Sequence, residues 1–212
     1  MTIRQTQGYM SRTNILNILA NQNHMTDEAI QQEQALIELA KKDELAFGKL
    51  YDRYFDGIYG FVYRRTDEEQ LAGDITSQVF LKALQNIKKY EFRGLPFSSW
   101  LYRIASNEIN KYYRKKNRKV VFSLEEERIR EIIEEDEEDH KEAYLSLLVE
   151  CLNEMKTGVI EVLELRFFEE KNFKEIAYIL DISESGAKMR TYRALEQLKE
   201  NFNIKIRDNG EA

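Results

Sequence analysis

The sequence has little of several residue types on which other classes of protein depend. Its 212 residues include one cysteine, one proline and two histidines. The single cysteine, Cys151, allows no intramolecular disulfide and agrees with a reducing cytoplasm. Together with His24 and His140 it supplies too few ligands for a zinc site. Because no glycine-rich phosphate loop precedes a helix either, we expect no metal, no cofactor and no catalysis by this chain alone.

Long hydrophobic runs are also absent. No stretch approaches the roughly 18 apolar residues of a membrane helix, and the first residues lack the apolar segment of a signal peptide. We therefore expect no membrane insertion and a cytoplasmic location. A hydrophobic content of 42%, a charged content of 33% and one proline are typical of a helical protein. No convincing strand pair is found, so we predict an all-α fold.

Charge is unevenly distributed along the chain, although its net value is −6. Residues 41–119 carry a net charge of +7, residues 120–150 carry −9, and residues 151–206 carry −1. A basic block followed by an acidic block indicates two helical domains with a linker between them. The predicted divisions are a disordered extension at 1–25, a first domain at 26–119, an acidic linker at 120–140, a second domain at 141–206 and a tail at 207–212.

Apolar residues recur at helical spacing in both predicted domains. The first domain is expected to hold helices at 26–42, 44–65, 66–88 and 97–116, and the second at 141–156 and 157–168. Asp43 and Thr157 are suitable N-caps, and Thr66 with Glu69 forms a capping-box pattern. Cys151 falls on an apolar helical face and is expected in the core.

The stretch from Asn172 to Phe202 predicts two helices joined by a tight turn at Asp181 and Ile182. Ser183 is a good N-cap for the second helix, whose buried stripe should face its partner. The outer face of that helix is basic, a pattern typical of a helix-turn-helix that enters the major groove of DNA. An ordinary helical hairpin with solvated charges is the alternative for this stretch alone.

A second basic stretch ends the predicted 97–116 helix. Residues 111–119 hold six cations and two tyrosines, Tyr112 and Tyr113. Cations neutralise phosphates and aromatic rings stack on bases, so we expect contact with single-stranded or distorted DNA. The loop at 89–96 adds further aromatics and cations nearby. The alternative is a cationic helix end favoured by the helix dipole.

The acidic linker admits two interpretations. It is either a solvated spacer, helical around 124–133, or a segment whose charge repels DNA or covers a basic face until a partner displaces it.

Both halves together resemble the extracytoplasmic-function sigma factors of bacterial RNA polymerase. The first half is similar to their sigma-2 domain through FGKLYDRYFDGIYGFVYRRT, DITSQVFLKAL and FSSWLYRIASNEINKYYRKK. The second half resembles their sigma-4 domain through LELRFFEEKNFKEIAYILDIS and AKMRTYRAL. The resemblance implies a non-enzymatic factor that binds core RNA polymerase and promoter DNA and helps to open the DNA. An anti-sigma protein is a further partner that it suggests.

The resemblance also implies roles for individual residues. It places contact with the polymerase clamp at Asp74, Gln78, Val79 and Phe80. It assigns the downstream promoter element to Phe92, Arg93, Asn107, Lys111, Arg114 and Lys115. It assigns the upstream element to Ser185, Lys188, Met189, Arg190 and Arg193.

Three positions depart from the family pattern. Ser77-Gln78 stands where Gln-Glu is usual, Lys111 where Asp is common, and Gly186-Ala187 where Thr-Val is usual. Gly186 should weaken the first helical turn by about 1 kcal/mol relative to Ala. Two rival functions remain: a DNA-binding regulator that acts without polymerase, and an interaction protein that sequesters a partner.

Overall fold

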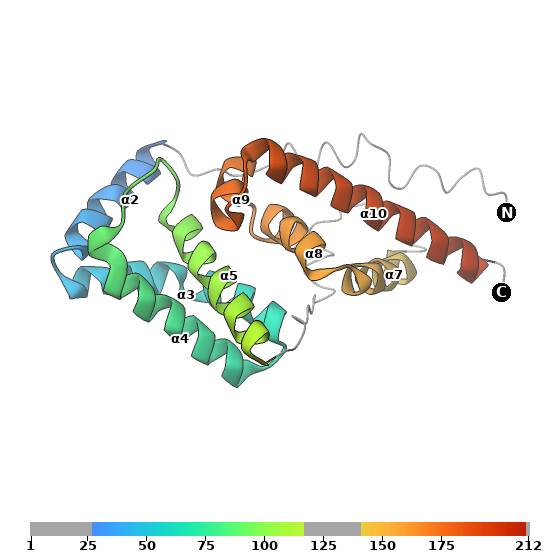
Figure 1. Ribbon diagram of the computed structural model, residues 1–212, viewed down its shortest axis with the longest axis horizontal. Coiled ribbons are helices and arrows are strands. Elements are labelled where there is room, and N and C mark those ends of the chain that lie inside the picture. The colour runs from blue at the N-terminus through green and yellow to red at the C-terminus, as the bar shows by residue number, and fades with distance from the viewer. Residues whose placement is uncertain (1–26, 117–140, 211–212) are drawn as a thin grey trace.

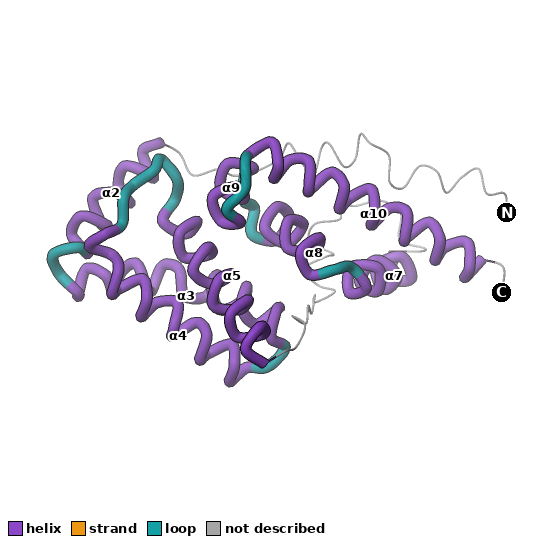
Figure 2. The backbone as a smooth tube through the Cα atoms, viewed as in Figure 1, coloured by secondary structure: helices purple, strands orange, loops and turns teal. Residues whose placement is uncertain are grey.

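The computed structural model describes residues 27–116 and 141–210. Every regular element in these two ranges is a helix, as Figure 2 shows, which confirms the all-α prediction. The first group comprises α2 (Asp27–Ala40), α3 (Glu44–Thr66), α4 (Glu69–Asn86), the 3₁₀ turn η2 (Ile87–Lys89) and α5 (Phe97–Lys116). The second comprises α7 (Lys141–Glu154), α8 (Thr157–Leu163), the π-helical turn η4 (Glu164–Phe168), α9 (Phe173–Leu180) and α10 (Glu184–Gly210). Residues 1–25 and the possible helix at 124–133 lie outside the described ranges.

In the first group, α3 packs against α2, α4 and α5. Its apolar residues repeat every three or four positions, so they form one buried stripe. Leu50, Ile58, Phe61 and Val62 on that stripe are all at most 1% exposed. The stripe meets Val79 of α4 and the first turns of α5, which closes the core.

In the second group, the long helix α10 crosses α7, α8 and α9 (Figure 1). Ala194, Leu198 and Phe202 of α10 pack with Cys151 of α7 and Leu163 of α8. Cys151 is fully buried, as the sequence predicted.

The two groups do not stand apart. In Figure 1, α5 and α9 lie side by side at the centre of the molecule, and they are in direct contact. Leu165, Ile176 and Ala187 of the second group belong to the same apolar cluster as the core of the first group. The composition predicted two domains and a linker but gave no sign of this shared cluster.

Outside the α9–α10 turn, the helix ends confirm one predicted cap and correct two others. Asp43 caps α3 by accepting a hydrogen bond from the Leu45 N–H at 2.9 Å. The capping box at Thr66 and Glu69 is wrong, because Thr66 ends α3 and its hydroxyl donates to the Val62 carbonyl at 3.1 Å. The cap at Thr157 is also wrong, because Thr157 is the first residue of α8 itself.

Glu33 of α2 provides an unpredicted cap for α5. Its Oε2 accepts a hydrogen bond from the Phe97 N–H at 2.7 Å, and the Tyr54 hydroxyl donates to its other oxygen. Glu33 is completely buried, and this burial raises the pKa of its carboxyl while the Phe97 N–H opposes the shift. The start of α5 therefore depends on a side chain from a helix 64 residues away in sequence.

Candidate nucleic-acid and polymerase interfaces

The turn between α9 and α10 is built from local hydrogen bonds. A capping box opens α9: the Glu175 N–H donates to Asn172 Oδ1 at 2.9 Å, and the Asn172 N–H donates to Glu175 Oε2 at 3.1 Å. Asp181 ends α9 in the left-handed region with φ of 57°. The Gly186 N–H then donates to Ser183 Oγ at 3.0 Å, which confirms Ser183 as a cap for α10. These bonds fix the angle at which α10 leaves α9.

The first turns of α10 separate into a buried and an exposed face. Ala187, Thr191 and Ala194 are fully buried against the other helices. The residues predicted to read the upstream element are all exposed: Met189, Arg193 and Ser185 lie away from the buried face, and Lys188 and Arg190 flank it. Met189, at 51% exposed, gives this basic face an apolar centre. Such a face offers phosphate contacts together with an apolar group that suits a thymine methyl.

The second basic surface lies on α5 and the loop before it. Arg93, Asn107, Lys111, Arg114 and Lys115 are exposed, whereas Phe92 is half-buried and packs against the core.

Some aromatic side chains near this surface are core residues instead. Tyr113 is 6% exposed and its hydroxyl donates to the Arg65 carbonyl at 3.0 Å, and Tyr90 is 8% exposed. The expectation of exposed stacking rings is therefore wrong for these two. Tyr112 is half-buried.

The residues predicted to contact polymerase lie on α4 and divide into two pairs. Asp74 and Gln78 are exposed, one helical turn apart on the outer face. Val79 is 0% and Phe80 is 4% exposed, because both point into the core, where the Phe80 ring lies 4.7 Å from that of Tyr51. Only Asp74 and Gln78 can therefore offer side chains to a partner in this conformation.

A buried network of charges, which the sequence reasoning missed, joins the two helical groups. Arg64 and Arg65 lie in the last turn of α3, and both bind Glu164, through Arg64 Nε at 3.1 Å and Arg65 Nε at 2.7 Å. Arg65 also pairs with Glu161 at 2.9 Å, and Arg64 pairs with Glu169. The arginines come from the first group and the carboxylates from the second. The sequence did hold one sign of this network: Glu161 and Glu164 interrupt the apolar run at 159–168, where a buried charge needs a partner.

Neighbouring hydroxyls extend this network. The Ser106 hydroxyl donates to Glu161 at 2.7 Å, and the Tyr102 hydroxyl donates to Glu169. Burial raises the pKa of Glu164, against the effect of its two arginines, and also raises that of Tyr102. Burial would raise the pKa of Glu161 too, but Arg65, with help from Ser106 and Arg190, outweighs burial and lowers that pKa. The arginine pair thus stabilises the ionised carboxylates.

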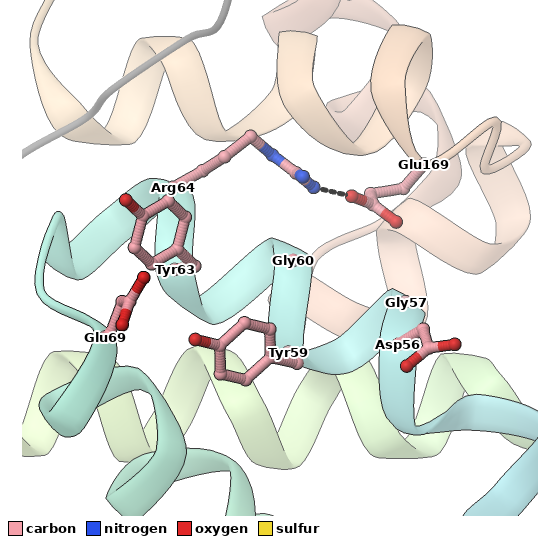
Figure 3. Close-up of a pocket in the computed structure, with 8 residues that line it drawn as sticks. All are labelled: Asp56, Gly57, Tyr59, Gly60, Tyr63, Arg64, Glu69 and Glu169. Carbon is pink, nitrogen blue, oxygen red and sulfur yellow. Dashed lines mark hydrogen bonds and ion pairs between the residues drawn. The ribbon is translucent and has the colours of Figure 1, made fainter.

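A pocket of about 450 Å³ opens beside this network (Figure 3). Its walls include Asp56, Glu69 and Glu169, while Arg64 contributes the only cation of the lining and is paired with Glu169. The excess of carboxylates repels phosphate, so this pocket is unsuited to nucleic acid. Within residues 27–116 and 141–210, no cluster of His, Cys, Asp and Glu could hold a metal ion. No helix in these ranges is long and apolar enough to cross a membrane.

Comparisons with known proteins identify both halves of the chain. The model of sigma-70 region 2 matches residues 50–119, and that of sigma-70 region 4 matches residues 151–200. The RNA polymerase sigma factor YlaC of Bacillus subtilis is 33% identical over 72% of this chain and 90% of its own length. The ECF RNA polymerase sigma factor SigM of the same organism is 26% identical over 77% of this chain and 99% of its own. The chain belongs to the ECF sigma factors of the sigma-70 family.

Other relatives share this assignment. The ECF RNA polymerase sigma factor BldN of Streptomyces coelicolor is 30% identical over 77% of this chain and 63% of its own length. The solved structure of CnrH in complex with the cytosolic domain of CnrY shows the same fold, with a TM-score of 0.56 at 20% identity. It covers 81% of this chain and 97% of that one. As a sigma factor, this chain is not an enzyme, and it directs RNA polymerase to promoters.

Proposed function

We propose that the two exposed basic surfaces divide promoter recognition between them, with α10 at the upstream element and the α5 surface at the downstream element. The observation that carries this proposal is the exposure of Lys188, Met189 and Arg193 on one face of a helix whose other face is buried. In this proposal the side chains at the start of α10 enter the major groove of duplex DNA. Arg190 and Ser185 flank them.

The α5 surface is proposed to hold the unpaired strand of the downstream element. Arg114 and Lys115 extend the cationic end of α5 that begins with Lys111, and neutralise phosphates. Arg93, Phe92 and Asn107 lie nearer the start of the helix, where unpaired bases would be trapped.

Contact with core polymerase is proposed for the outer face of α4. Asp74 and Gln78 carry this assignment because their side chains are exposed. Val79 and Phe80 would act indirectly, by packing α4 on the core. The functional units are proposed to be 26–119 and 141–206, with 120–140 as the linker. A factor that works with polymerase on the chromosome is proposed to act in the cytoplasm.

An anti-sigma protein is proposed as a regulatory partner. Support comes from related structures alone: CnrH is in complex with the cytosolic domain of CnrY, and RpoE of Bartonella quintana is in complex with the anti-sigma factor NepR.

Run-off transcription with purified core polymerase on genomic fragments tests the division of roles. We expect discrete transcripts that require this chain, and their start sites will locate both DNA elements. Changing Lys188 and Arg193 to Ala together should abolish them. A double change of Lys42 and Arg207 to Ala, which removes the same charge from exposed sites elsewhere, should not. Equal activity of the two double variants would refute the assignment of α10.

A further inference from the structure

Aromatic rings close the neck of the loop before α5, which carries Phe92 and Arg93, two of the proposed strand contacts. Tyr90 begins this loop and Phe97 follows it as the first residue of α5. Their rings meet edge to face, with centroids 5.3 Å apart. Gly94 turns the chain between them with φ of 67°, a value that suits glycine. The position of Phe97 therefore sets where the loop and its side chains lie.

Phe97 is held from outside the loop by Glu33 of α2. Glu33 Oε2 accepts a hydrogen bond from the Phe97 N–H at 2.7 Å, and the Tyr54 hydroxyl of α3 donates to the other oxygen. The Tyr54 ring also lies 6.1 Å from that of Phe97. Glu33 and Phe97 are both 0% exposed, so water does not compete for this bond. Helices α2, α3 and α5 thus meet at one carboxylate, which the Tyr54 hydroxyl orients.

The bond from Phe97 to Glu33 fixes a direction as well as adding stability. The first N–H groups of a helix have no partner within it, and a side chain that accepts from one of them determines where the first turn starts. Here the acceptor is 64 residues away on another helix, so the start of α5 is fixed relative to α2. Trp100, one turn into α5, packs on Tyr90 with centroids 4.8 Å apart. A shift of the first turn would therefore move the loop with it.

We propose that Glu33 is a positioning residue for promoter opening: its carboxylate fixes the loop before α5 in the shape that holds an unpaired base of the downstream element. Glu33 is completely buried and touches no DNA. It acts through Phe92 and Arg93, so its role rests on the proposed function of the α5 surface. The ligand of the loop is a nucleotide of single-stranded DNA, whose base offers a face for stacking and whose phosphate offers a charge for Arg93.

Two DNA probes separate this role from a general loss of stability. The first is a duplex that holds the upstream element alone, and the second continues this duplex into one unpaired strand of the downstream element. Both sequences come from the start sites found by run-off transcription, and each strand is tested in turn. The ratio of the two affinities, measured for the full-length chain in complex with core polymerase, isolates the contribution of the unpaired strand. A partly unfolded variant binds both probes less and leaves the ratio unchanged.

We expect Glu33→Ala to lower this ratio about tenfold, the contribution of one stacked base. Glu33→Gln should restore the ratio to within about twofold of wild type, because its amide oxygen still accepts from the Phe97 N–H. The matched control is Ile37→Ala. Ile37 lies one turn further along α2 and is 1% exposed, so its truncation destabilises the same helical group without removing the cap. The ratio for this control should equal that of wild type.

Glu33→Asp provides a second variant if Glu33→Ala fails to fold, because its shorter side chain cannot keep the bond to the Phe97 N–H. A wild-type ratio in the folded Ala and Asp variants would overturn the positioning role. An equal fall in Ile37→Ala, or no rescue by Glu33→Gln, would overturn it as well. A wild-type chain that gains nothing from the unpaired strand would instead refute the proposed function of the α5 surface, and the role of Glu33 with it.

Discussion

Replacing Glu33 by alanine should destabilise region 2, although no promoter contact is assigned to this residue. The carboxylate accepts hydrogen bonds from the Phe97 N–H and the Tyr54 hydroxyl. Phe97 is 0% exposed, so water cannot replace the lost partner of its N–H. An unsatisfied buried donor costs about 1–3 kcal/mol, and loss of the Tyr54 bond adds about 1 kcal/mol. We expect Glu33→Ala to lower the free energy of unfolding by about 2–4 kcal/mol.

Glu33→Gln should behave differently, because its amide oxygen still accepts from the Phe97 N–H. We expect a loss below about 1 kcal/mol at neutral pH. The raised pKa of Glu33 sets the pH dependence: a carboxyl that binds its proton more tightly when folded contributes most below its unfolded pKa. That contribution is lost as pH rises through the folded value. The stability of Glu33→Gln relative to wild type should therefore improve from acid to neutral pH.

Urea unfolding followed by fluorescence is a direct assay. Trp100 is the only tryptophan, and its ring lies 4.8 Å from that of Tyr90 and 5.3 Å from that of Phe97, beside the cap. Glu38→Ala on the same helix is the control, because its pair with Lys41 is exposed and worth little. If Glu33→Ala cost no more than Glu38→Ala, the capping argument would be refuted.

Three further predictions concern region 4. Changing Lys188 and Arg193 to Ala together should weaken promoter binding by the polymerase complex. It should also reduce the slope of log K against log salt concentration by about 1.8, because each phosphate contact contributes about 0.9. An unchanged slope would show that neither residue contacts a phosphate. Gly186→Ala should not stabilise the chain, because the added Cβ would lie 2.9 Å from Ser183 Oγ. The loss of this cap, about 1 kcal/mol, offsets the gain in helix propensity of about the same size, and a thermal midpoint raised by several degrees would contradict this. The lowered pKa of Glu161 means that its contribution is present above the unfolded pKa and is lost as pH falls through the folded one. Energy transfer between dyes on the two helical groups, at Lys42→Cys and Arg207→Cys in a Cys151→Ala chain, should therefore decrease as pH falls below the unfolded pKa of Glu161. A signal that stays constant until the chain unfolds would contradict this.

The helices and the exposed basic side of α10 could be predicted because both depend on local spacing. Leu50, Ile58 and Phe61 recur at the helical period, and that period alone indicates which face is buried. The same rule places Met189 and Arg193 opposite the buried stripe and Lys188 at its flank. Local chemistry also predicted Ser183 as a cap.

Features that depend on distant pairing could not be predicted. The bond between Arg64 and Glu164 joins residues 100 positions apart, and nothing in either neighbourhood specifies the other. Similarly, nothing in the sequence around Glu33 indicates that its carboxylate caps the start of α5. The burial of Tyr113 depends on the backbone of Arg65. Hydrophobic periodicity therefore predicted the helices, whereas the side-chain contacts between distant helices could be seen only in the structure.

Because α10 is one continuous helix, the direction in which side chains point at its start is fixed relative to its far end. This helix has 27 residues, and Lys205 near its far end pairs with Glu150 and Glu154 of α7. Each residue of a helix turns it by about 100°, so one residue inserted in the middle of α10 would rotate the exposed basic side chains at its start by that angle relative to the anchored end. The exposed side chains at the start of α10 can therefore be substituted without turning the helix, whereas an insertion before its contact with α7 would turn them all.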